Sequence, residues 1–298
     1  MKRTRNKAGV IPYLFILPSF VFVFTFGYFT SGEAIWMSFT NFNTRLGNAA
    51  TRFVGVANYV GAFQDAYFWK SFGVQAIITV YSLIVGTVMP LLAAELLYFV
   101  RRKKIAGVFR MAFVVPMLVP VIVVLMTWRY LYNPSFGFNS ILKAVGMASS
   151  QQDWLNNAHT ALAAVLLVGF PYVSGLAFLV FYGGLANIGA EMQDAATVDG
   201  ASSLQSVFYI HIPNLVPYIS VIGSLTIIAS LTGSMGSVLA MTGGGPGSAT
   251  MIPALYMYKM GFGNGMMGYA CAFGVIIFVV VLALTLGQRR LFGTKLGG

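Results

Sequence analysis

Residues Glu191–Pro217, EMQDAATVDGASSLQSVFYIHIPNLVP, form a polar island in a very apolar chain. Three of the seven acidic residues of the protein lie within nine positions here, and no Lys or Arg occurs between Lys143 and Lys259. Long apolar runs flank the island on both sides. Because so polar a segment is too costly to place in lipid, we expect it to be a structured aqueous loop between two membrane spans.

The composition of the 298 residues is that of an integral membrane protein, with 58% hydrophobic and 8% charged residues. Soluble domains carry about 25% charged residues, so this chain has too few to cover a water-facing surface. Six spans of ~20 residues each use about 120 residues, which leaves room for loops but not for a second soluble domain. We therefore predict an all-α membrane protein with six transmembrane helices in a single transmembrane domain, residues 1–298.

The apolar runs predict where these spans lie. They fall near residues 11–30, 73–100, 111–132, 159–182, 217–240 and 267–286. The first run is too long for a signal-peptide core and no cleavage site follows it, so we expect it to be retained. Pro116 and Pro120 are expected to bend the third span, and Pro171 lies near the middle of the fourth.

Basic residues indicate the orientation. Twelve Lys and Arg lie in the N-terminal segment, the loop after span two and the C-terminal segment, all on one predicted side of the membrane. Six lie in the segments predicted on the opposite side. Both termini are therefore predicted to be cytoplasmic, and the island is cytoplasmic by alternation. The net charge of +11 is thus an orientation signal rather than a sign of nucleic-acid binding. The single cysteine and two histidines predict neither an internal disulfide nor a metal site.

Glu95 is an unusual residue, because it lies near the end of span two. A charge at the bilayer centre costs about 2.5–3.5 kcal/mol on insertion scales, and less near the interface. Arg101 and Arg102 follow it closely, and we favour an ion pair with one of them over a role in a proton relay.

The island itself predicts a helix, a turn and a second helix. Residues 189–199 favour a helix, Gly200 is placed to end it in a left-handed conformation, and Ser202 or Ser203 can cap a second helix through about Tyr209. Pro213 and Pro217 are expected to end the loop and start span five. Small residues here would let another surface approach the backbone, although an ordinary amphipathic loop that packs on its own bundle is the alternative.

A specific resemblance appears at this point. Asp194-Ala195-Ala196, three residues, Gly200, nine residues and Ile210-His211-Ile212-Pro213 resemble the EAA loop of binding-protein-dependent ABC importer permeases. The family pattern has Glu where this chain has Asp194, and Leu where it has Ile212. The triplet Asp199-Gly200-Ala201 and the aromatic Phe208 are similar to the sugar-permease branch, typified by the membrane subunits of the maltose system. Further phrases of that branch include Asn58-Tyr59, the segment from Trp128 to Pro134, and the segment from Thr242 to Gly247.

The resemblance implies a type I (MetI-like) transmembrane fold with a core near residues 72–288 and a cytoplasmic EAA loop at 187–216. It also implies a bacterial inner-membrane location and several partners. These are a second, similar permease, two ATPase subunits that carry ATP and Mg, and an extracytoplasmic solute-binding protein. The residues that the resemblance implies in ATPase coupling are Glu191, Asp194, Ala195, Ala196, Asp199, Gly200, Ala201, Phe208, Ile210 and Pro213.

The chain itself is not expected to be an enzyme or to hold a cofactor. It has no G-x-x-x-x-G-K-[ST] segment for nucleotide phosphates, and no nucleophile–base pair is visible. The alternative from another class is an ion-gradient-driven secondary transporter. That class places ionisable groups at mid-membrane, whereas Glu95 and Arg129 lie near the ends of predicted spans.

Candidates for the solute path lie in spans four and five. A stripe of small polar residues recurs at helical spacing in span five, at Thr226, Ser230, Ser234 and Ser237. Such a stripe is equally typical of close helix packing, and both interpretations stay open. Tyr172, Tyr182 and Asn187 can supply aromatic and neutral hydrogen-bonding contacts to a sugar-like solute. Oligosaccharides, polyols and glycerol phosphate all remain compatible with the pattern.

Overall fold

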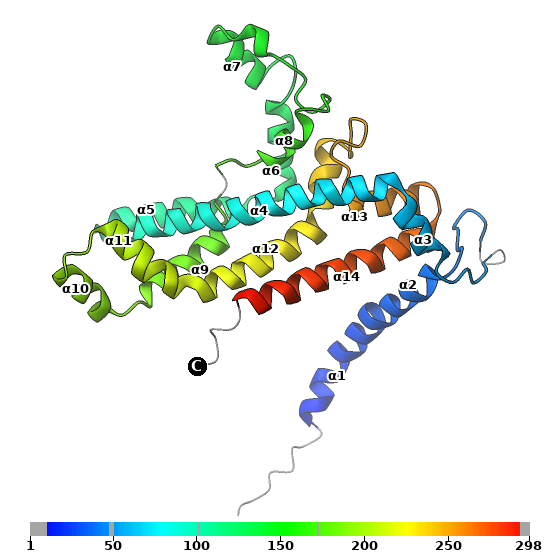
Figure 1. The fold of residues 1–298 in the computed structure, drawn as a ribbon, viewed down its shortest axis with the longest axis horizontal. Helices are drawn as coiled ribbons and strands as arrows, with labels where there is room; N and C mark the ends of the chain where they lie inside the picture. Colours follow the sequence, from blue (N-terminus) through cyan, green and yellow to red (C-terminus); the bar gives the residue numbers. More distant parts are fainter. Residues whose placement is uncertain (1–10, 48–50, 101, 172, 293–298) are drawn as a thin grey trace, which may run out of the picture. The chain divides into compact units, whose positions relative to one another are not determined.

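The computed structural model describes residues 11–47, 51–100, 102–171 and 173–292 (Figure 1). Among these residues the regular structure is helical, and the one β feature is an isolated bridge between Thr40 and Phe53. The basic residues of segment 1–7, Arg101, Tyr172 and Lys295 lie outside the described residues. Two compact units emerge, one of residues 1–65 with 257–276 and one of residues 66–256 with 277–298.

The first unit begins with one long helix. It consists of α1 (Ile11–Val23), the π-helical turn η1 (Phe24–Phe29) and α2 (Thr30–Ser38). Within it, the Thr30 hydroxyl donates to Phe26 O at 2.6 Å and the Ser31 hydroxyl to Gly27 O at 2.7 Å. Because these polar groups are satisfied inside the helix, they need no water, and the apolar helix continues beyond residue 30, where the predicted span ends.

The segment after α2 is folded rather than open. The Asn58 side chain, in α3 (Ala57–Gln64), donates to Ser38 O and to Thr40 O, both at 2.8 Å. The Gly268 N–H donates to Phe42 O at 2.9 Å. This segment therefore packs against the start of α14 (Met267–Phe292), whose residues through Ile276 belong to the same unit.

Three helices form the scaffold of the second unit. They are α4 (Ala66–Tyr98), α9 (Gly175–Ala186) and α12 (Ile212–Met241), and each packs on the other two. Part of their contact is an apolar cluster, whose fully buried members include Ala94, Phe178, Phe181, Leu185 and Leu215. A short helix, α5 (Lys103–Val114), adds to this core against α9.

The predicted bend of the third span is present and very sharp. α5 and the 3-10 turn η3 (Val115–Leu118) meet α6 (Val121–Leu131) at 91°. Pro116 lies inside η3, and Pro120 is the residue immediately before α6. Proline lacks the N–H that a continuing helix needs and clashes with the preceding turn, so two prolines four residues apart break the helix instead of curving it.

The fourth predicted span is interrupted, and the expectation of one helix across residues 159–182 is wrong. Helix occurs only in α8 (Ala161–Leu166) and in α9, with turns and irregular backbone between them. Gly169 there has φ +83° and Pro171 follows it. α9 alone has 12 residues, fewer than the ~20 that a straight span needs.

Length and apolarity leave four to six candidate spans among the described residues. Four are single helices, and two more count only if each bent pair of helices is one span. The single ones are Pro12–Ser38, Ala66–Tyr98, Ser203–Met241 and Met267–Gln288. The bent pairs are Lys103–Leu118 with Val121–Leu131, and Gly175–Ala186 with Ala190–Val198.

The connections between predicted spans three and four and between predicted spans five and six are folded. Residues 133–158 contain α7 (Phe138–Ala144) and η4 (Ala148–Ser150) around Asn139, whose buried side chain accepts a hydrogen bond from Trp154 Nε1 at 2.9 Å. The glycine-rich segment after α12 is tightly turned, with positive φ at Gly243, Gly244 and Gly247. It continues into α13 (Pro253–Tyr258) and η6 (Lys259–Gly263), helices that the sequence did not predict.

Candidate functional site: the loop between α9 and α12

The first helix of the polar loop ends as its sequence predicts. α10 (Ala190–Val198) begins after Gly189 and ends at Gly200, which has φ +74°. The Ala201 N–H donates to Ala196 O at 2.9 Å, and the Gly200 N–H donates to Thr197 O at 3.1 Å. These two bonds form a Schellman motif, which satisfies carbonyls at the helix end and requires a left-handed residue. The turn is therefore well defined.

The second helix starts at a capping box. Gln205 N donates to Ser202 Oγ at 3.3 Å, and Ser202 N donates to Gln205 Oε1 at 2.7 Å. The reciprocal bonds satisfy two N–H groups that the first helical turn would otherwise leave unpaired. Ser202, and not Ser203, is the cap of α11 (Ser203–Ser206).

The second helix does not end near Tyr209, as the sequence predicts, but continues through Pro213. α11, the π-helical turn η5 (Val207–His211) and α12 form one helix of 39 residues, Ser203–Met241. The Ile212 N–H bonds to Val207 O, five residues back. This hydrogen bond spans five residues instead of the four of an α-helix, and it directly precedes Pro213 in the first turn of α12. The N–H that Pro213 lacks therefore does not interrupt the helix. The second helix of the loop and α12 are therefore one continuous helix.

The loop presents an acidic and apolar surface. The side chains of Glu191, Asp194 and Asp199 are exposed, and no Lys or Arg lies in the loop. Large apolar side chains are exposed beside them, among them Val198 at 86%, Phe208 at 62% and Tyr209 at 80%. Apolar exposure of this kind is typical of a surface that contacts a partner.

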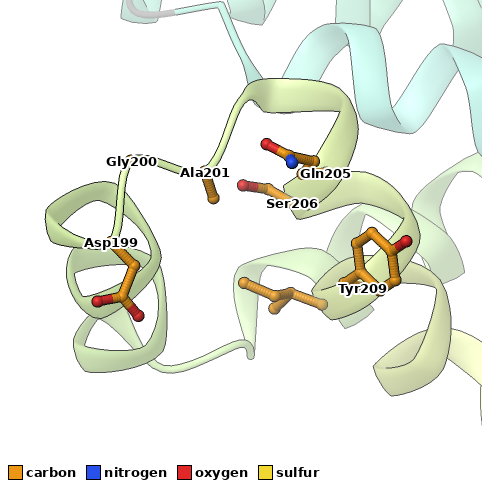
Figure 2. A pocket seen from close by; sticks show the side chains of 7 residues that line it. Asp199, Gly200, Ala201, Gln205, Ser206 and Tyr209 are labelled. Atoms are coloured by element: carbon orange, nitrogen blue, oxygen red, sulfur yellow. The ribbon is translucent and has the colours of Figure 1, made fainter.

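An open pocket of ≈ 240 Å³ lies between the turn and the second helix. Figure 2 shows Asp199, Gly200 and Ala201 on the turn, and Gln205, Ser206 and Tyr209 on the helix that follows. Ile210 completes the lining. The small residues at Gly200 and Ala201 leave this hollow unfilled.

The remaining loop residues divide by burial. Ala196 is the buried residue of α10, Ala195 is exposed, and Ala201 and Ile210 are half-buried. Pro213 is exposed at the start of α12. In Figure 1, α10 and α11 lie together at one end of α12.

The sequence did not single out His211 or Gln193, which the fold brings to Glu95. His211 is fully buried, with Nδ1 2.7 Å from Glu95 Oε2 and Nε2 2.7 Å from Gln193 Nε2. The partner of Glu95 is thus His211, and the ion pair expected with Arg102 is absent among the described residues. The alternative partner, Arg101, lies outside the described residues. Both residues are unusual in the sequence, His211 as one of two histidines and Glu95 as a carboxylate near the end of an apolar run, but no local pattern pairs them.

Residues of the α12 stripe contact α4. Ser230 is buried, its hydroxyl lies 3.0 Å from Thr79 Oγ1, and its carbonyl accepts from Gln75 Nε2 at 3.0 Å. A Cβ placed on Gly86 would lie 3.5 Å from the Thr226 methyl group. At these two positions the stripe makes the helix contacts that small residues permit. Ser234 and Ser237 are half-buried.

The other path candidates are placed elsewhere. Tyr182, in α9, contacts α5, where Arg110 donates to its hydroxyl at 3.0 Å and lies 4.7 Å from its ring centre. Asn187 is exposed at the end of α9. Tyr172 lies outside the described residues. Tyr182 and Asn187 thus flank the polar loop, and Tyr182 also ties α5 to α9.

Comparison with known proteins assigns the family. Residues 86–293 match the family described as "Binding-protein-dependent transport system inner membrane component". The chain is 29% identical to a probable ABC transporter permease protein, YurN, of Bacillus subtilis (strain 168), over 97% of this chain and 98% of that protein. It is also 29% identical to the multiple sugar-binding transport system permease protein MsmF of Streptococcus mutans serotype c, over 94% of each chain.

The fold is shared with a solved structure. A bacterial ABC transporter involved in the import of the acidic polysaccharide alginate superposes with a TM-score of 0.84, at 20% identity and over 96% of each chain. The family match covers more than half of the chain and includes the whole loop between α9 and α12. This protein therefore belongs to the family of inner membrane components of binding-protein-dependent transport systems, the permease subunits of ABC importers, which are not themselves enzymes because the ATPase is a separate subunit.

Proposed function

We propose that the loop at 187–216 is the element through which a separate ATPase subunit drives this permease. The observation that carries the proposal is the construction of the loop. A helix held by a Schellman turn leads through a capping box into one helix of 39 residues, Ser203–Met241. Such a loop is stiff enough to transmit a displacement, and its exposed acidic and apolar side chains fit an apolar cleft with a basic rim.

The mechanism that follows is alternating access. ATP, with Mg, binds on the two ATPase subunits and closes them, which moves the clefts that hold the loops of this chain and of a second, similar permease. Because α11 continues into α12, the movement reaches the interior of the bundle. The path then opens outward to an extracytoplasmic binding protein, and hydrolysis returns it inward. On this proposal both termini and the loop are cytoplasmic, in the inner membrane of a bacterium.

The proposed solute is a sugar or a related polyhydroxy compound. Support comes from the similar permease of a multiple sugar-binding transport system and from the low fraction of charged residues in the chain, 8%. The proposed path uses the two half-buried serines of α12, Ser234 and Ser237, with Tyr182 and Asn187 nearer the loop. Ser230 and Thr226 act by holding α12 against α4. Family membership leaves no role for the ion-gradient alternative, which needs mid-membrane ionisable groups.

Gly200 offers the sharpest test of the docking role. Its φ of +74° suits Gly and is tolerated by Asn, whereas a β-branched side chain is strained there. A Cβ at this position meets no heavy atom within 4 Å, so any effect comes from the backbone and not from crowding. Left-handed strain of about 1–2 kcal/mol is expected to displace the turn.

The measurement is ATP-dependent solute uptake in proteoliposomes that contain this chain, its ATPase, the second permease and the binding protein. Gly200→Val should lower uptake by about five- to thirtyfold, because 1.4 kcal/mol corresponds to a factor of ten. Gly200→Asn should retain uptake. Uptake equal to wild type in Gly200→Val would rule out the proposed role of the turn.

A further inference from the structure

A chain of three polar side chains links α10 to α4. Gln193 comes from α10, His211 from η5 and Glu95 from the last turn of α4. The two links, Gln193 Nε2 to His211 Nε2 and His211 Nδ1 to Glu95 Oε2, are both 2.7 Å long. They join segments that are 18 and 116 residues apart in sequence.

The centre of this chain is dry. His211 has no exposed surface and Glu95 is 6% exposed. The Tyr98 ring meets the His211 ring edge-on at 5.2 Å, and the Phe99 ring stacks on it at 5.9 Å. Water is therefore kept from the link between His211 and Glu95, which is electrostatically stronger than a hydrogen bond on the surface. The link between Gln193 and His211 is partly buried.

α10 has few other attachments to the bundle. Ala196 is its one buried residue, and its end is fixed by the turn at Gly200. Among the described residues, a sulfur contact of 3.8 Å between Asn214 Nδ2 and Met192 Sδ also links α10 to the start of α12. A helix with so little buried apolar surface depends on directional contacts for its position.

We propose that Gln193, His211 and Glu95 form a tether that transmits the displacement of α10 to α4, in parallel with the covalent route through α11 into α12. The proposal rests on the docking role proposed for the loop. α4 packs on both α9 and α12, so a tether that ends on α4 moves all three scaffold helices as one body. Gln193, His211 and Glu95 are positioning residues in this role and need not touch the solute.

The hydrogen bonds of the tether all run in the same direction, from Gln193 through His211 to Glu95. The Gln193 amide N–H donates to His211 Nε2, which leaves the ring proton on Nδ1 to donate to Glu95 Oε2. Glu95 Oε1 is buried and has no hydrogen-bond partner among the described residues. Glu95 therefore depends on His211 for its stabilisation. His211 in turn accepts the hydrogen bond from Gln193.

The test separates transmission from assembly. Gln193→Met keeps the length of the side chain and removes its N–H donor, while Thr197→Val removes a hydroxyl that bonds within α10, to Gln193 O at 2.9 Å. Both variants are assembled with the ATPase, the second permease and the binding protein, and the solute imported per ATP hydrolysed is measured. Gln193→Met is expected to assemble normally and to lower this ratio at least about fivefold. Thr197→Val should keep the wild-type ratio.

Two further variants make the result decisive. The double variant Glu95→Leu with His211→Phe removes the membrane end of the tether without leaving a buried charge, and it should lower the ratio as Gln193→Met does. Suppose that Gln193→Met and the double variant both keep the wild-type ratio of solute to ATP, while Gly200→Val lowers it. This result would overturn the tether and leave the docking role intact. A wild-type ratio in Gly200→Val as well would overturn the docking role and the tether together.

Discussion

His211 shows how a single residue can make a charged side chain tolerable at the end of an apolar helix. A buried carboxylate is costly unless an oppositely charged or hydrogen-bonding group offsets the loss of water. Glu95 meets this requirement with a histidine that lies 116 residues away and has no exposed surface. Flexible surface cations such as Arg102 would satisfy it less well, because they lose side-chain entropy when they are held in place.

Replacement of His211 should therefore destabilise the protein strongly. His211→Phe keeps the ring against Tyr98 and Phe99 but leaves Glu95 without a partner, which is expected to cost about 3–5 kcal/mol. Addition of Glu95→Leu removes the stranded charge and should recover most of that loss. Thermal unfolding of the purified protein in detergent measures both. Equal midpoints for the single and double variants would show that the pair contributes nothing to stability.

At the scale of elements, the loop follows from local sequence because its signals are local. Gly200 must adopt a left-handed conformation to close the Schellman turn, and Ser202 with Gln205 forms a capping box from residues three apart. These features need no knowledge of the rest of the chain. The loop was predictable from sequence for this reason.

The elements that were predicted wrongly depend on longer-range or competing effects. Pro213 is a helix breaker by local rules, but the π-helical register at Val207–His211 accommodates it. The apolar run at 159–182 reads as one span by composition, whereas Gly169 and Pro171 interrupt it. The contact between His211 and Glu95 involves residues with no periodic pattern, so only the assembled fold reveals it.

The capping box gives a prediction at this scale. Ser202→Ala removes the acceptor for Gln205 N and should destabilise the start of α11 by about 1 kcal/mol. Amide hydrogen exchange of Gln205 and Ser206, whose N–H groups donate to Ser202, is then expected to be about fivefold faster, since 1.4 kcal/mol corresponds to a factor of ten. Ser203→Ala is the matched control, because Ser203 does not cap the helix. Unchanged exchange in Ser202→Ala would count against a stiff loop.

For the whole molecule, the apolar helices and the lack of a nucleotide-binding segment in the sequence agree with the family of permease subunits. Four to six helices among the described residues are long and apolar enough to span a membrane, and the loop between α9 and α12 is a polar connection with two short helices of its own. The chain is without a nucleotide-binding segment in its sequence, and the family places ATP hydrolysis on another subunit. On the proposed mechanism, force enters this protein through a contact with that subunit, and the loop between α9 and α12 is the proposed surface for it.

Photo-crosslinking in the assembled importer tests whether the ATPase subunit contacts the loop between α9 and α12. A photoreactive phenylalanine at position 209, where the Tyr209 side chain is 80% exposed, should crosslink to the ATPase subunit. The same group at position 28, where Tyr28 is 70% exposed on the apolar N-terminal helix, should give no crosslink to the ATPase. A crosslink from position 209 to the binding protein or to lipid, with none to the ATPase, would contradict the account.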